Sequence, residues 1–322
     1  MFKKIMIWIL IIAVGLAALV FLGPREPVDE TISFNKADLG ADLEAYLQKQ
    51  EARFSDIIKG AEKEIVWADG ATKGQTEWAV IYIHGFSATK EETRPMPDLV
   101  AQALGANLYF TRLAGHGRSG DAMGDPQVNH WLNDVVEAIH IGEQLGKKIL
   151  LIGVSTGGSL ITWAANKPDL MQQVEGIVQI SPNFGVQAAG SEILSIPWAE
   201  YLTPMIVGSE RSWEAHNEEH QKWWSTRYPS VALLPMAASI NLARSLDHKK
   251  IDVPAFFIWS PKDTVIVPKL VEDVAQNWGE GADTMKIEES DDPNNHVIAG
   301  RILSPSTTDT VADSIIEWAE SL

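Results

Sequence analysis

The feature that most constrains the fold is an alternation, from residue 62 onward, of short apolar runs with segments of helical periodicity. The runs are apolar throughout rather than at every second position, which is typical of strands buried on both faces. Repeated strand–helix units of this kind predict a mostly parallel sheet with helices on both sides. The sequence therefore predicts an α/β fold. We expect strands at 64–68, 77–85, 106–113, 147–155, 175–183, 253–263 and 283–290.

The length of 322 residues suits one large α/β domain that carries an insertion. We assign residues 62–183 and 251–322 to the core of this domain. The stretch 184–250 interrupts the alternation and is rich in tryptophan. A structureless loop of that length is rare in a compact domain. We therefore predict a helical cap over the carboxyl edge of the sheet, where open α/β sheets bind ligands. Residues 25–61 are expected to form a stalk and a short helix.

Residues 1–24 form a separate apolar segment. Its uncharged run of 18 residues spans about 27 Å as a helix, close to the hydrocarbon thickness of a bilayer, about 30 Å. A cleaved signal peptide has a shorter apolar region and small residues before the cut, whereas Phe21 and Leu22 lie there in this chain. We favour an uncleaved anchor over a signal peptide, with Lys3 and Lys4 in the cytoplasm. This predicts a single-pass membrane protein whose domain is extracytoplasmic, on the periplasmic or cell-surface side.

Charge and cysteine content exclude several functions. The chain has 26 Lys and Arg against 43 Asp and Glu, a net charge of −17. So acidic a protein is not attracted to nucleic acid or to anionic lipid, and we expect no nucleic-acid partner. There are no cysteines, which excludes disulfides, thiolate catalysis and cysteine-based metal sites. We predict no metal and no cofactor.

The stretch Gly153-Val154-Ser155-Thr156-Gly157 lies between an apolar strand and a helical pattern. It matches G-x-S-x-G, in which a sharp strand-to-helix turn projects the serine hydroxyl above the sheet. Gly153 and Gly157 are the small residues of such a nucleophile elbow, because the two backbones pass close together. A glycine-rich turn with a helix-capping serine is the structural alternative, and a phosphate-binding loop would need a Gly-Lys-Ser/Thr sequence. The flanking strand and helix favour Ser155 as a nucleophile.

A nucleophilic serine needs a base, and the base needs an orienting acid. His296 follows the last predicted strand, and Asp263 stands at the carboxyl end of the strand before it. The chain order of serine, acid and histidine is the one that this kind of elbow requires. Asp291 and Asp292 are close to His296 in sequence, and we interpret them as part of a solvated loop.

The oxyanion formed by such a reaction needs two backbone donors. The predicted strand 77–85 runs into His84-Gly85-Phe86, and a helix follows. The amide of Phe86 is one candidate donor, and the amide of Thr156, directly after the serine, is the other. His84 is expected to support this loop rather than to titrate in catalysis.

The order of these motifs resembles that of the α/β-hydrolase superfamily over roughly residues 62–322. The motifs are HGF after a strand, GHGRS at 115–119, GVSTGG around the serine, and then the acid and the histidine. Within that superfamily the chain is most similar to the bacterial carboxylesterase and monoacylglycerol lipase group. It departs from the common pattern at Thr156, where Met or Gln is frequent, and at Ser260, where Gly is frequent. These departures leave the subfamily, and hence the substrate, open.

The resemblance implies a serine hydrolase that works through an acyl-enzyme. It assigns the nucleophile to Ser155, the general base to His296, its partner to Asp263 and the oxyanion amides to Phe86 and Thr156. We predict a carboxylic ester substrate with an apolar or lipid-like acyl group, because both the tryptophan-rich cap and the anchor suggest apolar surroundings. The same groups would cleave amides, so a serine peptidase is the alternative enzyme. A membrane-tethered binding module without chemistry is the alternative from another class.

Overall fold

The structure, a computed structural model, describes residues 2–322. Its core is a seven-stranded sheet with the strand order β1-β3-β2-β4-β5-β8-β9. All neighbours in it are parallel except β1, which pairs antiparallel with β3. This confirms the predicted α/β class. The strands are β1 (Glu64–Val66), β2 (Thr76–Ile83), β3 (Asn107–Phe110), β4 (Gly146–Val154), β5 (Val174–Ile180), β6 (Glu210–Ser212), β7 (Arg227–Pro229), β8 (Ala255–Trp259) and β9 (Ala282–Lys286).

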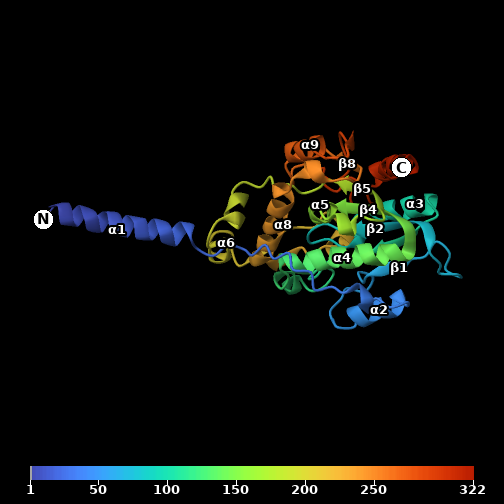
Figure 1. Ribbon diagram of the computed structural model, residues 1–322, viewed down its shortest axis with the longest axis horizontal. Helices are drawn as coiled ribbons and strands as arrows, with labels where there is room; N and C mark the ends of the chain where they lie inside the picture. The colour runs from blue at the N-terminus through green and yellow to red at the C-terminus, as the bar shows by residue number, and fades with distance from the viewer. Residues whose placement is uncertain (1) are drawn as a thin grey trace.

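Helices cover both faces of the sheet (Figure 1). The helices are α1 (Phe2–Phe21), α2 (Leu43–Glu51), α3 (Met96–Ala103), α4 (Val128–Leu145), α5 (Thr156–Ala165), α6 (Ala199–Val207), α7 (Glu218–Trp223), α8 (Leu233–Ser245), α9 (Pro268–Gln276) and α10 (Pro305–Glu320). One core layer contains residues of α4, α5, α8 and α9, and the other contains residues of α3 and α10. In β2, Ile81 packs in the first layer and Val80 and Tyr82 in the second. A strand buried on both faces in this way needs apolar residues at successive positions.

The prediction of a cap concerns the segment between β5 and β8. This segment forms α6, β6, α7, β7 and then α8. Strands β6 and β7 pair with each other in a separate antiparallel sheet. The end of the segment differs from the expectation for 184–250, because α8 packs against α5 inside the core layer. The parallel neighbours β5 and β8 need a crossover connection between them, and α8 supplies it.

The N-terminal helix α1 projects from the body of the molecule and has no buried residue (Figure 1). The segment after it, which we predicted as a stalk, lies along the domain surface. The side-chain oxygen of Asn133 in α4 accepts the backbone N–H groups of Ser33 at 2.8 Å and Phe34 at 2.7 Å. Glu30 accepts the indole N–H of Trp163 in α5 at 2.7 Å. The connection between α1 and the domain is therefore attached to helices of the core.

Candidate active site

Ser155 lies at the turn between β4 and α5. Its backbone angles are φ 51° and ψ −117°, a region that residues other than glycine seldom occupy. Its N–H donates to the carbonyl of Ile180 at 2.9 Å, and its carbonyl accepts the N–H of Asn183 at 2.9 Å. These two bonds hold the turn against the end of β5 and so maintain the strained conformation. The result is the strand–turn–helix arrangement that places a serine hydroxyl above a sheet.

The glycines on either side of the serine allow a close approach of two backbones. A Cβ on Gly157 would lie 2.3 Å from the carbonyl oxygen of Ile83. A Cβ on Gly153 would lie 2.9 Å from the carbonyl carbon of Gly157. Both distances are shorter than the contacts that real Cβ atoms make, so a side chain at either position would force the turn apart.

Of the three side chains predicted to act together, His296 lies in the middle, within hydrogen-bonding distance of both Ser155 and Asp263. The Oγ of Ser155 is 3.0 Å from Nε2 of His296, and Nδ1 of His296 is 2.7 Å from Oδ2 of Asp263. The other oxygen of Asp263 accepts the N–H groups of Val265 at 2.8 Å and Ile266 at 3.0 Å. A proton on Nδ1 faces the carboxylate, which leaves Nε2 as an acceptor for the serine proton. This geometry can pass a proton from a hydroxyl to an imidazole that a carboxylate supports.

Asp292 is buried, which contradicts our interpretation of both aspartates as a solvated loop. Asp291 is exposed, but Asp292 is only 2% exposed. The Oδ2 of Asp292 accepts the N–H groups of His296 and Val297, each at 2.9 Å. The reason is local: a tight loop carries His296, and its backbone N–H groups need an acceptor once they leave solvent. Asp292 therefore fixes the backbone of the histidine, as Asp263 fixes its ring.

The loop after β2 lies directly beside the serine. A Cβ placed on Gly85 would lie 3.2 Å from the Cβ of Ser155, so Phe86, the next residue, comes close to the elbow. His84 supports this loop: its Nδ1 donates to the carbonyl of Gly85 at 2.8 Å, and its Nε2 accepts the N–H of Leu113 at 3.0 Å. Burial lowers the pKa of His84 well below its ordinary value, so the ring is neutral and can play both roles. Thr156 is the first residue of α5.

Carboxylates around His296 set its basicity. Burial lowers the pKa of His296. The charge and hydrogen bond of Asp263, together with the charges of Asp292 and Glu92, outweigh burial and raise the pKa above its ordinary value. An imidazole with a raised pKa binds a proton more strongly, which favours the imidazolium that forms when the serine is deprotonated.

Apolar side chains from the segment 184–250 lie over both loops of the site. Trp223 and Trp224, at the end of α7, pack with Val297, the neighbour of His296. The ring of Phe86 packs edge-on against Tyr228, with 5.4 Å between the ring centroids. The surroundings of the serine are therefore mainly apolar and aromatic on the side of this segment.

Two of the other buried histidines, His116 and His220, lie near the site but stand apart from the hydrogen bonds of the serine. The Nδ1 of His116 donates to the carbonyl of Ala114 at 3.0 Å, and burial lowers its pKa to about 4. His220 packs between Trp213 and Trp224, and burial lowers its pKa to about 4. Both rings are neutral packing elements. Among residues 2–322, no group of three or more His, Asp or Glu side chains is arranged to hold a metal ion.

Comparisons with known proteins agree with this architecture. The family described as "Serine aminopeptidase, S33" matches residues 74–289. A thermostable monoacylglycerol lipase from Bacillus sp. (strain H-257) is 27% identical over 217 residues, which cover 66% of this chain and 78% of that protein. A solved structure from work on the metagenome-derived lipolytic enzymes LipS and LipT matches with a TM-score of 0.68 and 20% identity, over 83% of this chain and 100% of that chain. A soluble variant of monoglyceride lipase from Saccharomyces cerevisiae gives a TM-score of 0.62 and 14% identity, over 81% and 91% of the two chains.

Proposed function

The chain belongs to the serine aminopeptidase S33 family of α/β-hydrolases, and from this premise we propose that it is a serine hydrolase that cleaves carboxylic esters. The observation that carries the proposal is the pair of contacts through His296, 3.0 Å to the hydroxyl of Ser155 and 2.7 Å to the carboxylate of Asp263. A binding module without chemistry does not require this arrangement of side chains. It also does not require a serine in a strained backbone conformation, which costs free energy. Those two features favour an enzyme over the binding alternative.

The reaction proceeds through an acyl-enzyme. The Oγ of Ser155 attacks the ester carbonyl carbon while Nε2 of His296 takes its proton. The amides of Phe86 and Thr156 stabilise the oxyanion, and removal of one such donor typically costs about 3–4 kcal/mol of transition-state stabilisation. The carbon–oxygen ester bond then breaks, and the leaving alcohol receives the proton from Nε2. Water then attacks the acyl-enzyme and gives its proton to Nε2. The bond between the acyl carbon and Oγ of Ser155 breaks, Nε2 returns the proton to Oγ, and the acid leaves. Asp263 supports the imidazolium in both steps.

The acyl group of the substrate is apolar and lipid-like. Support comes from the aromatic side chains that pack over the histidine loop and the Phe86 loop, because apolar acyl chains bind to such surfaces. The Bacillus relative is a monoacylglycerol lipase by name, and the yeast structure is a monoglyceride lipase with a substrate analogue. We therefore propose monoesters of apolar acids as the substrate class.

A fluorophosphonate probe tests the enzyme proposal. The full-length chain, purified in detergent, is expected to form one adduct at Ser155, and Ser155→Ala is expected to form none. Ser159, a buried serine one turn further along α5, is the internal comparison in the peptide map. Folded protein without an adduct at Ser155 would remove the proposal of a serine hydrolase.

A serine aminopeptidase is the second candidate, because the matching family carries that description. The same three side chains would cleave an amide. A panel that sets aryl esters of increasing acyl length against aminoacyl anilides separates the two. We expect hydrolysis of the esters, with kcat/KM rising as the acyl chain lengthens. A clear preference for the anilides would replace the esterase proposal with the peptidase.

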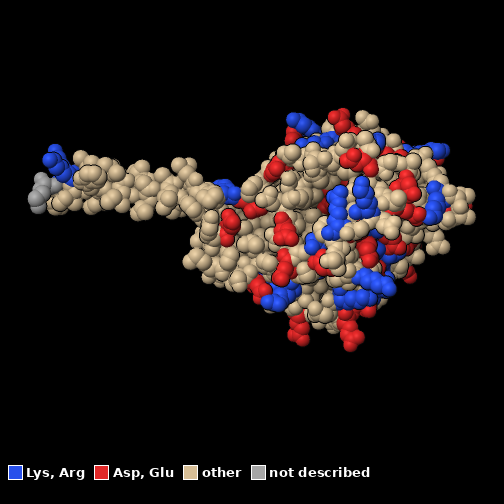
Figure 2. Space-filling view, turned by 90° about the horizontal axis from the view of Figure 1, so that it is seen from below, with Lys and Arg blue, Asp and Glu red and all other residues tan. Residues whose placement is uncertain are grey.

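We also propose that α1 is an uncleaved membrane anchor. Among residues 2–322 it is the one helix long and apolar enough to cross a membrane. Figure 2 shows α1 as an uncharged rod between the lysines at its tip and the body of the domain. Lys3 and Lys4 at the free end favour a cytoplasmic N-terminus and an extracytoplasmic domain.

The cap helix α6 lies beside the end of α1 (Figure 1). Trp198 donates its indole N–H to the carbonyl of Leu19 at 2.9 Å and its backbone N–H to the carbonyl of Pro24 at 2.6 Å. On α6, Met205 is 80% and Ile206 64% exposed. Exposed apolar side chains next to an anchor are placed to contact the membrane surface. This supports a domain whose cap faces the bilayer.

Because the chain has no cysteine, one introduced thiol reports its topology. Ala71→Cys places a thiol on an exposed turn of the domain. In intact spheroplasts, a membrane-impermeant maleimide is expected to label this residue, and the full-length chain is expected to stay with the membrane fraction. Labelling only after lysis would contradict the orientation, and recovery of the full-length chain in the soluble fraction without detergent would contradict the anchor.

A further inference from the structure

A buried carboxylate that the proposed reaction does not use lies next to the site. Glu92 is 2% exposed and belongs to η2 (Lys90–Glu92), a 3₁₀ turn between β2 and α3. Its Oε1 accepts the backbone N–H of Gly85 at 2.7 Å and the hydroxyl of Tyr82 at 2.8 Å. Burial of an ionisable carboxyl is costly, so its position beside a catalytic loop calls for a functional reason.

Glu92 and Ser155 both lie close to the α-carbon of Gly85, which has no side chain. A Cβ on Gly85 would lie 3.0 Å from Oε2 of Glu92 and 3.2 Å from the Cβ of Ser155. The N–H of Gly85 donates to Glu92, and the next residue is Phe86, the proposed oxyanion donor. The orientation of the Phe86 amide therefore depends on the bond that Glu92 accepts.

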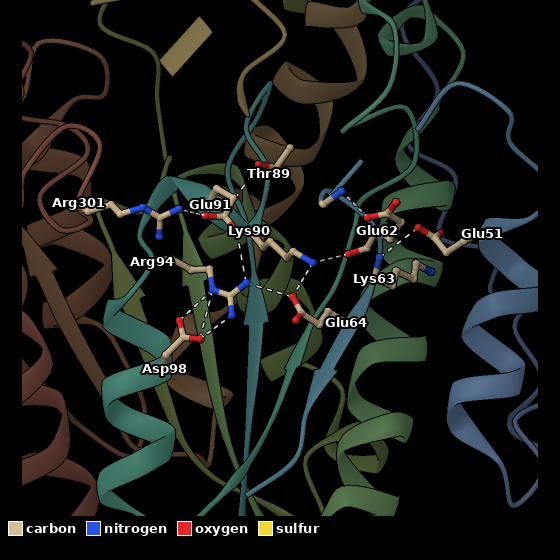
Figure 3. Close-up of polar contacts among 11 residues, drawn as sticks. Glu51, Glu62, Lys63, Glu64, Thr89, Lys90, Glu91, Arg94, Asp98 and Arg301 are labelled. Carbon is tan, nitrogen blue, oxygen red and sulfur yellow. Dashed lines mark hydrogen bonds and ion pairs between the residues drawn. The ribbon is translucent and has the colours of Figure 1, made fainter. Parts of the chain in front are cut away.

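Ion pairs on the residues before Glu92 hold η2 in place (Figure 3). Lys90 donates to the carbonyl of Glu62 at 2.8 Å and pairs with Glu64 of β1 at 2.6 Å. Glu91 pairs with Arg94 at 3.3 Å and with Arg301, which follows the histidine loop. We call this set of six residues the η2 clamp: Glu62, Glu64, Lys90, Glu91, Arg94 and Arg301. The clamp fixes the turn between β1 and the histidine loop, while the side chain of Glu92 reaches the loop after β2.

We propose that Glu92 is a positioning residue of this site: it holds the oxyanion loop beside Ser155 through Oε1, and its charge stabilises the imidazolium of His296. The proposal rests on the proposed function and adds a second carboxylate to it. Asp263 acts on the histidine by direct contact, whereas Glu92 acts on it through space. Proton transfer from Ser155 turns the neutral imidazole of His296 into an imidazolium, and a nearby negative charge favours that change.

The groups that face Glu92 explain how it titrates. Burial raises the pKa of Glu92 to about 7, although the Gly85 N–H, the Tyr82 hydroxyl and His296 each lower it. Arg94 and Arg301 pair with Glu91 rather than with Glu92. Asp263 and Asp292 face the histidine and raise its pKa, as Glu92 does. Glu92 is therefore charged above about pH 7, and Glu92 and His296 titrate as a coupled pair.

The first test separates the charge of Glu92 from its hydrogen bonds. In Glu92→Gln the carboxamide oxygen still accepts from Gly85 and Tyr82, but the charge is gone. We expect the pKa of His296 to fall, because a negative charge that raised it has been removed. The measurement is an NMR titration of the full-length chain, labelled at histidine, in detergent micelles. Glu175→Gln changes an exposed carboxylate of β5 that lies outside the η2 clamp, and is expected to leave the pKa of His296 unchanged.

The second test removes the support of the loop. Glu92→Ala leaves the N–H of Gly85 without its acceptor. We expect kcat for an aryl ester to fall about 10²–10³-fold, the loss typical of one oxyanion donor, with little change in KM. Circular dichroism checks that the variant is folded.

The proposal is overturned if the pKa of His296 is the same in Glu92→Gln and the wild type, or if folded Glu92→Ala keeps kcat within about threefold of the wild type. The titration needs no turnover, so its outcome is independent of the proposed function. A wild-type enzyme that fails to react with fluorophosphonate would defeat the function alone, while an unchanged titration would defeat the role of Glu92 alone.

Discussion

At the scale of single residues, two neighbouring aspartates differ sharply in what they contact. Asp291 is exposed and accepts one N–H, from Ser306 at 2.8 Å. Asp292 is buried, and its Oδ2 accepts the N–H groups of His296 and Val297, each at 2.9 Å. The backbone of the loop that carries His296 therefore depends on the second aspartate and not on the first.

Asp292→Ala is expected to destabilise the protein and to misplace His296. It leaves three backbone N–H groups without their acceptor, that of the exposed Asn294 and those of His296 and Val297. Each buried unsatisfied group costs about 1–3 kcal/mol, and the last two decide the loss. The free energy of unfolding should fall by roughly 2–5 kcal/mol, and kcat should fall with it. Asp291→Ala is the matched control and should leave the stability nearly unchanged, because Asp291 is exposed. Chemical denaturation followed by circular dichroism checks both, and equal losses in the two variants would contradict the assignment.

The polar residues of the site were only partly predictable. The proximity of Ser155, Asp263 and His296 could be predicted because each follows a recognisable apolar strand and the serine has its own motif. The role of Asp292 was missed, since a run such as DDPNNH has the composition of a solvated loop and gives no sign of what covers it. Glu92 was missed for a similar reason, because KEE at 90–92 has the composition of an exposed helix start, and its burial depends on contacts distant in sequence.

At the scale of elements, the turn between β4 and α5 decides how closely strand and helix approach. A Cβ on Gly157 would lie 2.3 Å from a carbonyl oxygen of β2, that of Ile83. The neighbouring strand cannot give way, because its backbone is paired on both sides, with β3 and with β4. The absence of a side chain at Gly157 therefore allows β2, β4 and α5 to approach one another closely at this turn.

Gly157→Ala is expected to abolish folding or to cost more than about 4 kcal/mol, the range of severe core overpacking and backbone strain. Gly70→Ala is the matched control, because a Cβ there would meet no atom within 4 Å. Expression yield and the thermal midpoint of each variant check the prediction. A Gly157→Ala protein that melts with the control would show that the turn can open without cost.

The order and type of the core elements could be predicted because buried strands leave a strong apolar signal. The predicted strand at 147–155, for example, corresponds to β4, Gly146–Val154. The direction of β1 could not be predicted, since the same short apolar run pairs equally well either way. The role of α8 as a crossover was missed because its sequence has the same helical character as the cap before it, and only the pairing of β5 with β8 separates the two.

At the scale of the whole molecule, the connector between α1 and the domain is packed rather than free. Ser33 and Phe34 are held by Asn133 of α4, and Glu30 is held by Trp163 of α5. These contacts join residues about a hundred positions apart in the sequence. No local pattern in the stretch 25–35 could therefore predict them. The domain is therefore fixed at a short distance from the end of α1.

Two truncated chains separate the anchor from the connector. A chain that begins at residue 25 loses α1, none of whose residues is buried, and is expected to be soluble and active on aryl esters. A chain that begins at residue 36 also loses the hydrogen bonds to Asn133 and Trp163. At about 1 kcal/mol for each bond, plus the buried part of Phe34, its free energy of unfolding should be roughly 2–5 kcal/mol lower. Urea unfolding of the two chains in the same buffer checks this. Equal stabilities would mean that the connector contributes nothing to the stability of the domain.

A packed connector has a consequence for how the enzyme meets its substrate. If α1 spans a bilayer, as proposed, the packed connector keeps the domain close to the membrane surface. An ester carried in that membrane would then reach the enzyme by lateral diffusion, and turnover would follow the number of substrate molecules per unit of membrane area rather than their concentration in bulk.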